Sequence, residues 1–132
     1  MSIDGEVVDS IEAGLLVLIG VASGDRAEQA SKLASKVARL RVFDREGRME
    51  RSLVDVGGAA LCVSQFTLYG DVRRGLRPSF GDAAEPALAQ QLYELFCARI
   101  EAEGVRVARG RFGGRMSVAL VNEGPVTLLL EA

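Results

Sequence analysis

The chain has 132 residues, of which 48% are hydrophobic and 26% are charged, and its formal net charge is −2. These values are ordinary for a globular protein and exclude a generally basic nucleic-acid binder. The chain contains no histidine and only two cysteines, which excludes Ser-His and Cys-His nucleophile pairs and zinc-finger spacings. We therefore expect no metal and no cofactor, and chemistry that uses hydroxyls, amides, backbone groups, carboxylates or the substrate itself.

The cysteines and the apolar runs indicate a location. Cys62 and Cys97 lie within apolar patterns, as buried thiols do, and form no disulfide framework. No apolar run reaches the roughly 18 residues that a membrane span needs, and the polar N-terminus does not resemble a signal peptide. The sequence predicts one domain, residues 1–132, in the cytoplasm and without a membrane partner.

The first part of the chain predicts strands around one helix. Residues 3–22 predict two strands, a short one at 6–8 and a buried one at 14–22. Asp25 with a carboxylate three residues later is a capping-box pattern, and apolar residues at helical spacing extend it to about Arg41. A strand is expected from Val42, followed by a turn at 44–47. Residues 52–56 are predicted as a short strand before the Gly57-Gly58 turn.

Residues 61–68 are predicted as one buried strand, because the first half is apolar on both faces. Its second half is polar. Strand side chains alternate, so Gln65 and Thr67 are expected on one face and Ser64 and Phe66 on the other. Polar groups at the end of a buried strand either bond to neighbouring backbone or serve a ligand.

An ordered loop is predicted at 70–82, and it carries Arg73, Arg74 and Arg77. A second arginine cluster comprises Arg106, Arg109, Arg111 and Arg115. Arginine suits bidentate contact with phosphate, although solvated surface is the default interpretation of either cluster.

The rest of the chain predicts a second helix and three more strands. Pro86 suits the first turn of a helix that ends at Gly104. A short strand is expected at 105–108 and a flexible turn at 110–114, and two final strands at 116–121 and 126–131. The expected fold is mixed α/β, with a mostly antiparallel curved sheet or partial β-barrel and two main helices packed on it.

Two motifs carry a family resemblance. Ser64-Gln65-Phe66-Thr67-Leu68 and Asn122-x-Gly124-Pro125-Val126-Thr127 closely resemble the two signature motifs of the D-aminoacyl-tRNA deacylases. Segments 14–18, 74–80 and 110–112 with Met116 are also similar to that family, in order and at suitable distances. The resemblance covers essentially the whole chain.

The resemblance implies an enzyme that hydrolyses the ester between a D-amino acid, or glycine mischarged on tRNA-Ala, and the 3′-terminal adenosine of tRNA. It implies a homodimer with the active site at the interface. Pocket residues of one subunit would be Ser64, Gln65, Phe66 and Thr67, with Phe112 and Met116 as walls. The turn containing Asn122, Gly124 and Pro125 would reach in from the partner subunit as the chirality filter.

The resemblance also implies a cis bond between Gly124 and Pro125, whereas the residues alone predict trans, because only about 5–6% of X-Pro bonds are cis. A rigid backbone filter would reject L side chains by collision. A further implied strand, with an arginine that braces this turn, would precede Met1. Its absence is expected to reflect either a late start codon or a version that lacks the brace.

Several alternatives remain open at this level. Thr67 is either a nucleophile or a positioning residue in a reaction assisted by the ribose 2′-hydroxyl, which we favour because the chain offers Thr67 no base. Phe66 either stacks on adenine or belongs to the core. The first arginine cluster either binds acceptor-end phosphates or holds its own loop. For the whole chain, the alternatives to an enzyme are a tRNA-end or nucleotide-binding module without turnover and a structural dimer.

Overall fold

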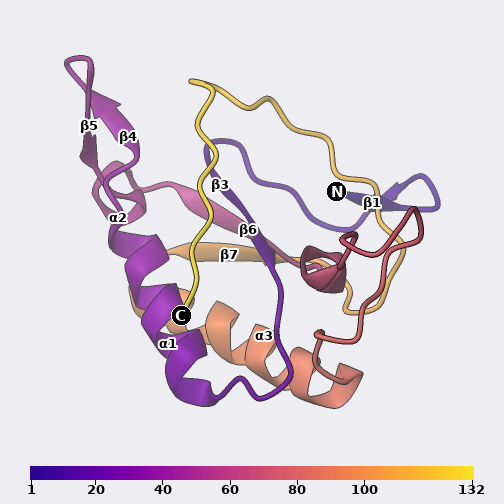
Figure 1. Cartoon of the computed structure of the whole chain (residues 1–132). Coiled ribbons are helices and arrows are strands. Elements are labelled where there is room, and N and C mark those ends of the chain that lie inside the picture. The colour runs from indigo at the N-terminus through magenta and orange to yellow at the C-terminus, as the bar shows by residue number, and fades with distance from the viewer.

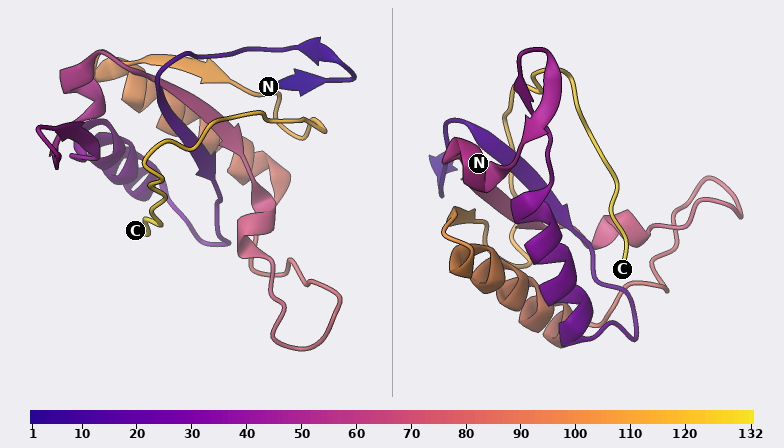
Figure 2. Two further views of the ribbon diagram at one scale, coloured as in Figure 1. Left: turned by 90° about the horizontal axis from the view of Figure 1, so that it is seen from above. Right: turned by 90° about the vertical axis from the view of Figure 1, so that its left-hand side faces the viewer.

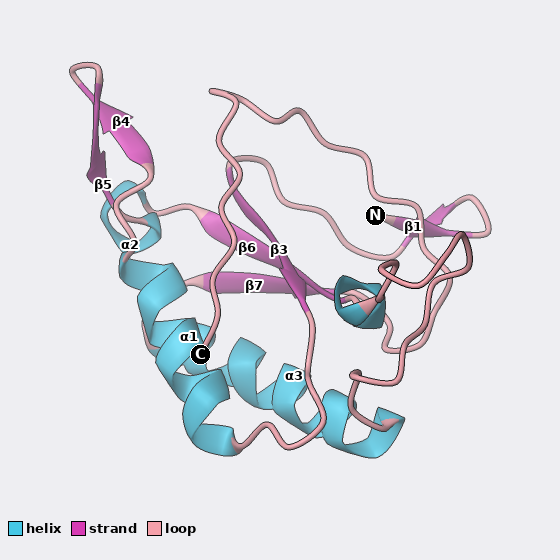
Figure 3. Ribbon diagram, viewed as in Figure 1, coloured by secondary structure: helices cyan, strands magenta, loops and turns pink.

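The computed structural model describes all residues from Met1 to Ala132 and is built around a small parallel sheet (Figures 1 and 3). The chain forms, in order, β1 (Ser2–Ile3), β2 (Glu6–Val7), β3 (Gly14–Ile19), α1 (Ala27–Arg39), β4 (Phe43–Arg45), β5 (Arg48–Arg51), α2 (Leu53–Val56), β6 (Ala59–Ser64), a 3₁₀ turn η1 (Phe66–Tyr69), α3 (Pro86–Ala102) and β7 (Arg106–Arg109). None of the helices combines the length and apolar character that a membrane span requires.

The central sheet has the strand order β3-β6-β7, and both pairings are parallel. Parallel neighbours need a crossover connection, which α1 and α3 supply. The predicted mixed α/β class with two main helices is confirmed, and there is no closed barrel. The expectation of a mostly antiparallel sheet is wrong for this central unit. Antiparallel pairing is confined to the hairpins β1-β2 and β4-β5 and to three isolated bridges.

The two faces of the sheet are covered differently. On one face α1 and α3 pack against the sheet in a core that includes Ala34, Val37, Cys62, Phe96 and Ile100. On the other face a smaller cluster joins Leu61, Val63 and Ala108 to Met1, with Leu16, Met116 and Val118 packed around it. Irregular segments from both ends of the chain therefore cover this second face (Figure 2).

Both helices form close to their predicted positions, with one difference at the start of α1. The backbone N–H of Arg26 donates to Gln29 Oε1 at 2.6 Å, so the helix begins one residue later than predicted. Asp25 accepts instead from the backbone N–H of Ala22 at 2.7 Å. Helix α3 starts with Pro86, and the chain leaves it through Gly104, whose φ of +90° lies in the left-handed region.

The predicted strand at 52–56 is wrong, because these residues form the helical turn α2. The Ser52 side chain accepts from the Asp55 backbone N–H at 3.1 Å, and the Asp55 carboxylate accepts from the Ser52 N–H at 2.8 Å. This is a capping box, which satisfies two backbone donors at once. Gly57 then ends the turn in the left-handed conformation.

The two predicted C-terminal strands, 116–121 and 126–131, are also absent. Ser117 forms an isolated bridge with Ser2 through two backbone hydrogen bonds of 2.8 Å. Residues 118–131 make none of the 63 backbone–backbone hydrogen bonds of the chain. Several of their apolar side chains are exposed, among them Val121 at 91% and Leu129 at 81%. This C-terminal segment is thus a peptide without a paired neighbour.

Candidate active site

The first motif lies where β6 leaves the sheet. Ser64 is its last residue, and the Gln65 N–H donates to the Ile19 carbonyl at 2.8 Å. The chain then turns into η1, so the predicted continuation of the strand to residue 68 is wrong. Gln65 and Thr67 are nevertheless neighbours, because Gln65 Nε2 donates to Thr67 Oγ1. The turn brings together two side chains that strand alternation was expected to align.

The start of η1 also leaves two backbone donors free. The N–H groups of Phe66 and Thr67 have no acceptor within the chain, as is usual for the first residues of a helical turn. Gln65 separates them from Ser64, the last residue of β6. A carbonyl oxygen that develops negative charge could accept from both donors.

Phe66 is a surface aromatic, because 57% of it is exposed. Its ring meets the edge of Phe80 at a centroid distance of 5.1 Å and an angle of 68°, a favourable arrangement for two aromatic rings. Gly70 sits beside this pair, and a Cβ there would lie 3.0 Å from the Thr67 oxygen and 3.1 Å from the Phe80 ring. The core interpretation of Phe66 is therefore wrong, whereas Phe80 was not identified from the sequence as its support.

Tyr93 of α3 holds the C-terminal half of β6 through a hydrogen bond from the helix-covered side of the sheet. Its buried hydroxyl donates to the Cys62 carbonyl at 2.8 Å, and the Gly110 N–H donates to the same oxygen at 3.2 Å. Burial raises the pKa of Tyr93, so this hydroxyl keeps its proton. A hydrogen bond with Cys97, together with burial, raises the pKa of the Cys62 thiol, which makes Cys62 an inert core residue.

The bond to Gly110 brings the predicted wall residues to this end of the sheet. Phe112 packs on Tyr93 with ring centroids 6.4 Å apart. Met116 packs on the cluster of Leu61 and Val63 and lies so close to Gly110 that a Cβ there would meet its sulfur at 2.8 Å. Both residues thus lie near β6, but Phe112 packs with the core on the helix side and Met116 with the cluster on the other face. Their role as pocket walls stays a prediction.

The second motif forms a separate turn. Asn122 Nδ2 donates to Thr127 Oγ1 at 3.0 Å across it, and Gly124 has a φ of +119°. The chain has no cis peptide bond, so the expected cis bond before Pro125 is wrong and the bond is trans. The turn is exposed and lies away from η1 in Figures 1 and 2. One chain therefore does not bring the two motifs together.

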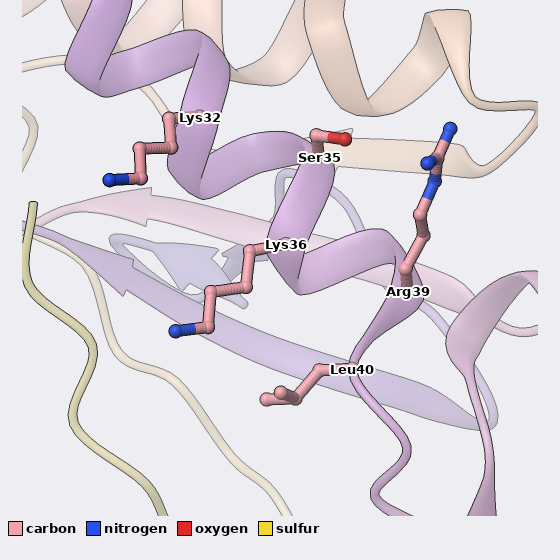
Figure 4. A pocket seen from close by; sticks show the side chains of 5 residues that line it. All are labelled: Lys32, Ser35, Lys36, Arg39 and Leu40. Atoms are coloured by element: carbon pink, nitrogen blue, oxygen red, sulfur yellow. The ribbon is translucent and has the colours of Figure 1, made fainter.

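Two hollows in the surface lie away from the motif residues. One lies along α1 and is lined by Lys32, Ser35, Lys36, Arg39 and Leu40 (Figure 4). Another lies at the opposite end of the sheet from η1, around Gly14, Phe43 and Gly57. No group of three or more potential metal ligands occurs. Residues Ser64–Thr67, called here the ledge, are half-buried at Ser64 and Gln65 and exposed at Phe66 and Thr67. A closed pocket over the ledge requires another surface.

Comparisons with known proteins agree on one family. The family model described as D-Tyr-tRNA(Tyr) deacylase matches residues 1–131. The D-aminoacyl-tRNA deacylase of Roseiflexus castenholzii (strain DSM 13941 / HLO8) is 54% identical over 133 residues, covering 100% of this chain and 85% of that protein. That of Thermus aquaticus is 53% identical over 133 residues, covering 100% and 88%.

Solved structures share the fold. The structure titled c-Myc DNA Unwinding Element Binding Protein has a TM-score of 0.91 and 34% sequence identity, covering 99% of this chain and 90% of that chain. A probable eukaryotic D-amino acid tRNA deacylase has a TM-score of 0.71 at 20% identity, covering 86% and 83%. The second likeness concerns the fold alone.

Proposed function

This chain belongs to the D-Tyr-tRNA(Tyr) deacylase family, and we propose that it hydrolyses the ester bond of D-aminoacyl-tRNA, releasing the D-amino acid and free tRNA. It is a hydrolase that acts on aminoacyl-tRNA. The observation that carries this function is the family match over residues 1–131, which includes both motifs. A cytoplasmic location and activity on glycine mischarged on tRNA-Ala are further parts of the proposal.

The active site is completed by a second copy of the chain. The two motifs lie apart within one chain, and the Ser64–Thr67 ledge is open. In the proposed homodimer the turn of Asn122, Gly124 and Pro125 from one protomer covers the ledge of its partner. The unpaired C-terminal segment and its exposed apolar side chains support such an interface.

The main chain of the Gly124-Pro125 turn selects the D enantiomer of the aminoacyl group. A main-chain wall beside the α-carbon of the substrate excludes an L side chain, because the wall cannot move aside as a side chain does. Gly124 suits this place, since its φ of +119° is a conformation that L residues rarely adopt. The proposal does not require a cis bond.

The chemistry is assisted by the substrate. The free N–H groups of Phe66 and Thr67 stabilise the oxyanion, and the ribose 2′-hydroxyl of the terminal adenosine assists attack by water. Phe66 presents an exposed ring on which adenine can stack, a contact worth about 1–3 kcal/mol. Thr67 positions Gln65 and the ester and does not act as the nucleophile, because no base lies beside its hydroxyl.

The test compares D-tyrosyl-tRNA with L-tyrosyl-tRNA in the presence of a chelator. We expect cleavage of the D ester only. Equal cleavage of both esters refutes the chiral selection, and tight binding without cleavage indicates a module without turnover. A D-aminoacyl-tRNA that ends in 2′-deoxyadenosine tests the role of the ribose 2′-hydroxyl. We expect its rate of deacylation to fall by about 100-fold or more. An unchanged rate would refute assistance by the 2′-hydroxyl but leave the proposed deacylase activity intact.

A further inference from the structure

The segment Asp71–Ser79, called here the arginine loop, projects from the body of the molecule directly after η1 (Figure 2). Its two ends are joined by a pair of backbone hydrogen bonds: the Asp71 N–H donates to the Ser79 carbonyl at 2.7 Å, and the Ser79 N–H donates to the Asp71 carbonyl at 2.9 Å. The loop therefore has a fixed base rather than two independent attachments.

The base of the loop is tied to the candidate active site on both sides. Before it, the Gly70 N–H donates to the Thr67 carbonyl at 2.9 Å. After it, Phe80 packs its ring against Phe66. The loop is thus mounted on the same 3₁₀ turn that carries the motif residues, and its orientation follows that turn.

The three arginines of the loop are not equivalent. The Arg73 guanidinium makes a bidentate ion pair with the Asp71 carboxylate at 3.0 and 2.8 Å, and the backbone N–H of Arg73 donates to the same carboxylate. The charge of Arg73 is therefore paired within the loop and stabilises its conformation. Arg74 and Arg77 are exposed and make no ion pair or side-chain hydrogen bond. Their guanidinium groups are free for an external anion.

The second predicted cluster differs, because two of its members are already paired. Arg106 pairs with Asp9, and Arg109 pairs with Glu101. The lysines of α1 line the hollow of Figure 4 and lie on another part of the surface from η1. Arg111 and Arg115 of the second cluster are exposed and make no ion pair. Of the two clusters, however, only Arg74 and Arg77 offer free charge on the loop that continues directly from η1, in a chain whose net charge is −2.

We propose that Arg74 and Arg77 bind backbone phosphates of the RNA strand immediately preceding the 3′-terminal adenosine. This inference rests on the proposed function and names the part of the substrate that the arginine loop recognises. A planar guanidinium matches a phosphate through two parallel hydrogen bonds. With the terminal adenosine on Phe66, the preceding nucleotides leave the ledge beside the arginine loop.

The test removes both free charges and measures two substrates. The variant is Arg74→Ser with Arg77→Ser. The matched control is Arg45→Ser with Arg48→Ser, which removes two exposed, unpaired charges from the β4-β5 hairpin at the other end of the sheet. Both are assayed on D-tyrosyl-tRNA and on D-tyrosyl-adenosine, which has no preceding phosphate.

For two single-stranded phosphate contacts we expect a loss of about 25-fold in kcat/KM on D-tyrosyl-tRNA near 0.1 M salt, and a salt slope lower by about 1.4. Activity on D-tyrosyl-adenosine should be unchanged, and the control should match the unmodified protein. Equal losses on both substrates would overturn the proposal, since the loop would then only support η1. So would equal losses in the variant and the control.

A second measurement separates this proposal from the proposed function. Binding of uncharged tRNA is titrated against salt for the same proteins. If the unmodified protein cleaves neither substrate, the proposed function fails, but a lower slope confined to the Arg74 and Arg77 variant still supports the arginine loop. An unchanged slope overturns it.

Discussion

Tyr93→Phe deletes one buried hydroxyl and no carbon atom, so it isolates the hydrogen bond that anchors the end of β6. The Cys62 carbonyl loses the bond from Tyr93 at 2.8 Å but keeps the bond from the Gly110 N–H at 3.2 Å. Since no buried polar group is left unpaired, the cost is that of one ordinary hydrogen bond, about 1 kcal/mol. For a chain of this size we expect a fall in Tm of about 3–5 °C.

The assay is urea unfolding together with thermal unfolding, and Tyr69→Phe is the matched control. Tyr69 is the only other tyrosine, and its hydroxyl makes no hydrogen bond within the chain. Its loss should change stability by less than about 0.5 kcal/mol. Equal stability of the two variants would refute the view that Tyr93 holds β6. Activity should change little, because the Gln65 N–H still binds the Ile19 carbonyl.

Three further predictions concern η1 and the adjoining arginine loop. Thr67→Ala should retain most of the deacylation rate of D-tyrosyl-tRNA, because Thr67 only positions its neighbours; total loss would make it the nucleophile. The Arg73 guanidinium lowers the pKa of Asp71 from 3.8 to about 2, so the ion pair is intact above about pH 4 and is lost as the pH falls towards 2. NMR titration should place the Asp71 midpoint near pH 2. In Arg73→Gln the midpoint should rise but stay below 3.8, because the backbone N–H of residue 73 still donates to the carboxylate; identical midpoints would contradict the pair. Gly20→Ala places a methyl group 3.1 Å from η1, whereas Gly81→Ala meets nothing closer than 4.0 Å, so the first should be less stable by about 1–2 kcal/mol in thermal unfolding. Equal stability of the two variants would show that η1 shifts to accommodate the methyl group at little energetic cost.

Local patterns predicted the two main helices and the three strands of the central sheet. The apolar run at 14–22 and the helical spacing after Ala27 both depend on near neighbours in the chain, and β3 and α1 form there. The strand predicted at 52–56 failed although its signal was present. Ser52 and Asp55 stand at capping-box spacing, and a cap outweighs β-branched residues over so short a segment.

The second half of the stretch at 61–68 shows a different limit. Alternation of polar residues cannot distinguish a strand from a turn when the segment is only a few residues long. The chain leaves the sheet at Gln65, where Thr67 is reached by a turn. The parallel direction of the strands in the central sheet could not be predicted from local patterns either, because it depends on which strands the helices connect.

The candidate site was identified mainly through the family motifs. Their residue types alone did not distinguish a ligand-binding site from a strand end whose polar side chains form hydrogen bonds with neighbouring backbone. Tyr93 was missed because its role depends on the register of α3 against β6, and Phe80 because its partner lies across a long loop. The Gly124-Pro125 bond is trans, as the residues alone predict and contrary to the resemblance.

The unpaired C-terminal segment has a consequence for amide hydrogen exchange. In a lone protomer, residues 118–131 have no backbone partner to slow the replacement of their hydrogens by deuterium. Assembly that buried this segment and paired its amides would convert it from one of the fastest-labelling parts of the chain into a protected one. Deuterium uptake followed over a dilution series would therefore report directly on whether these residues have found a neighbour.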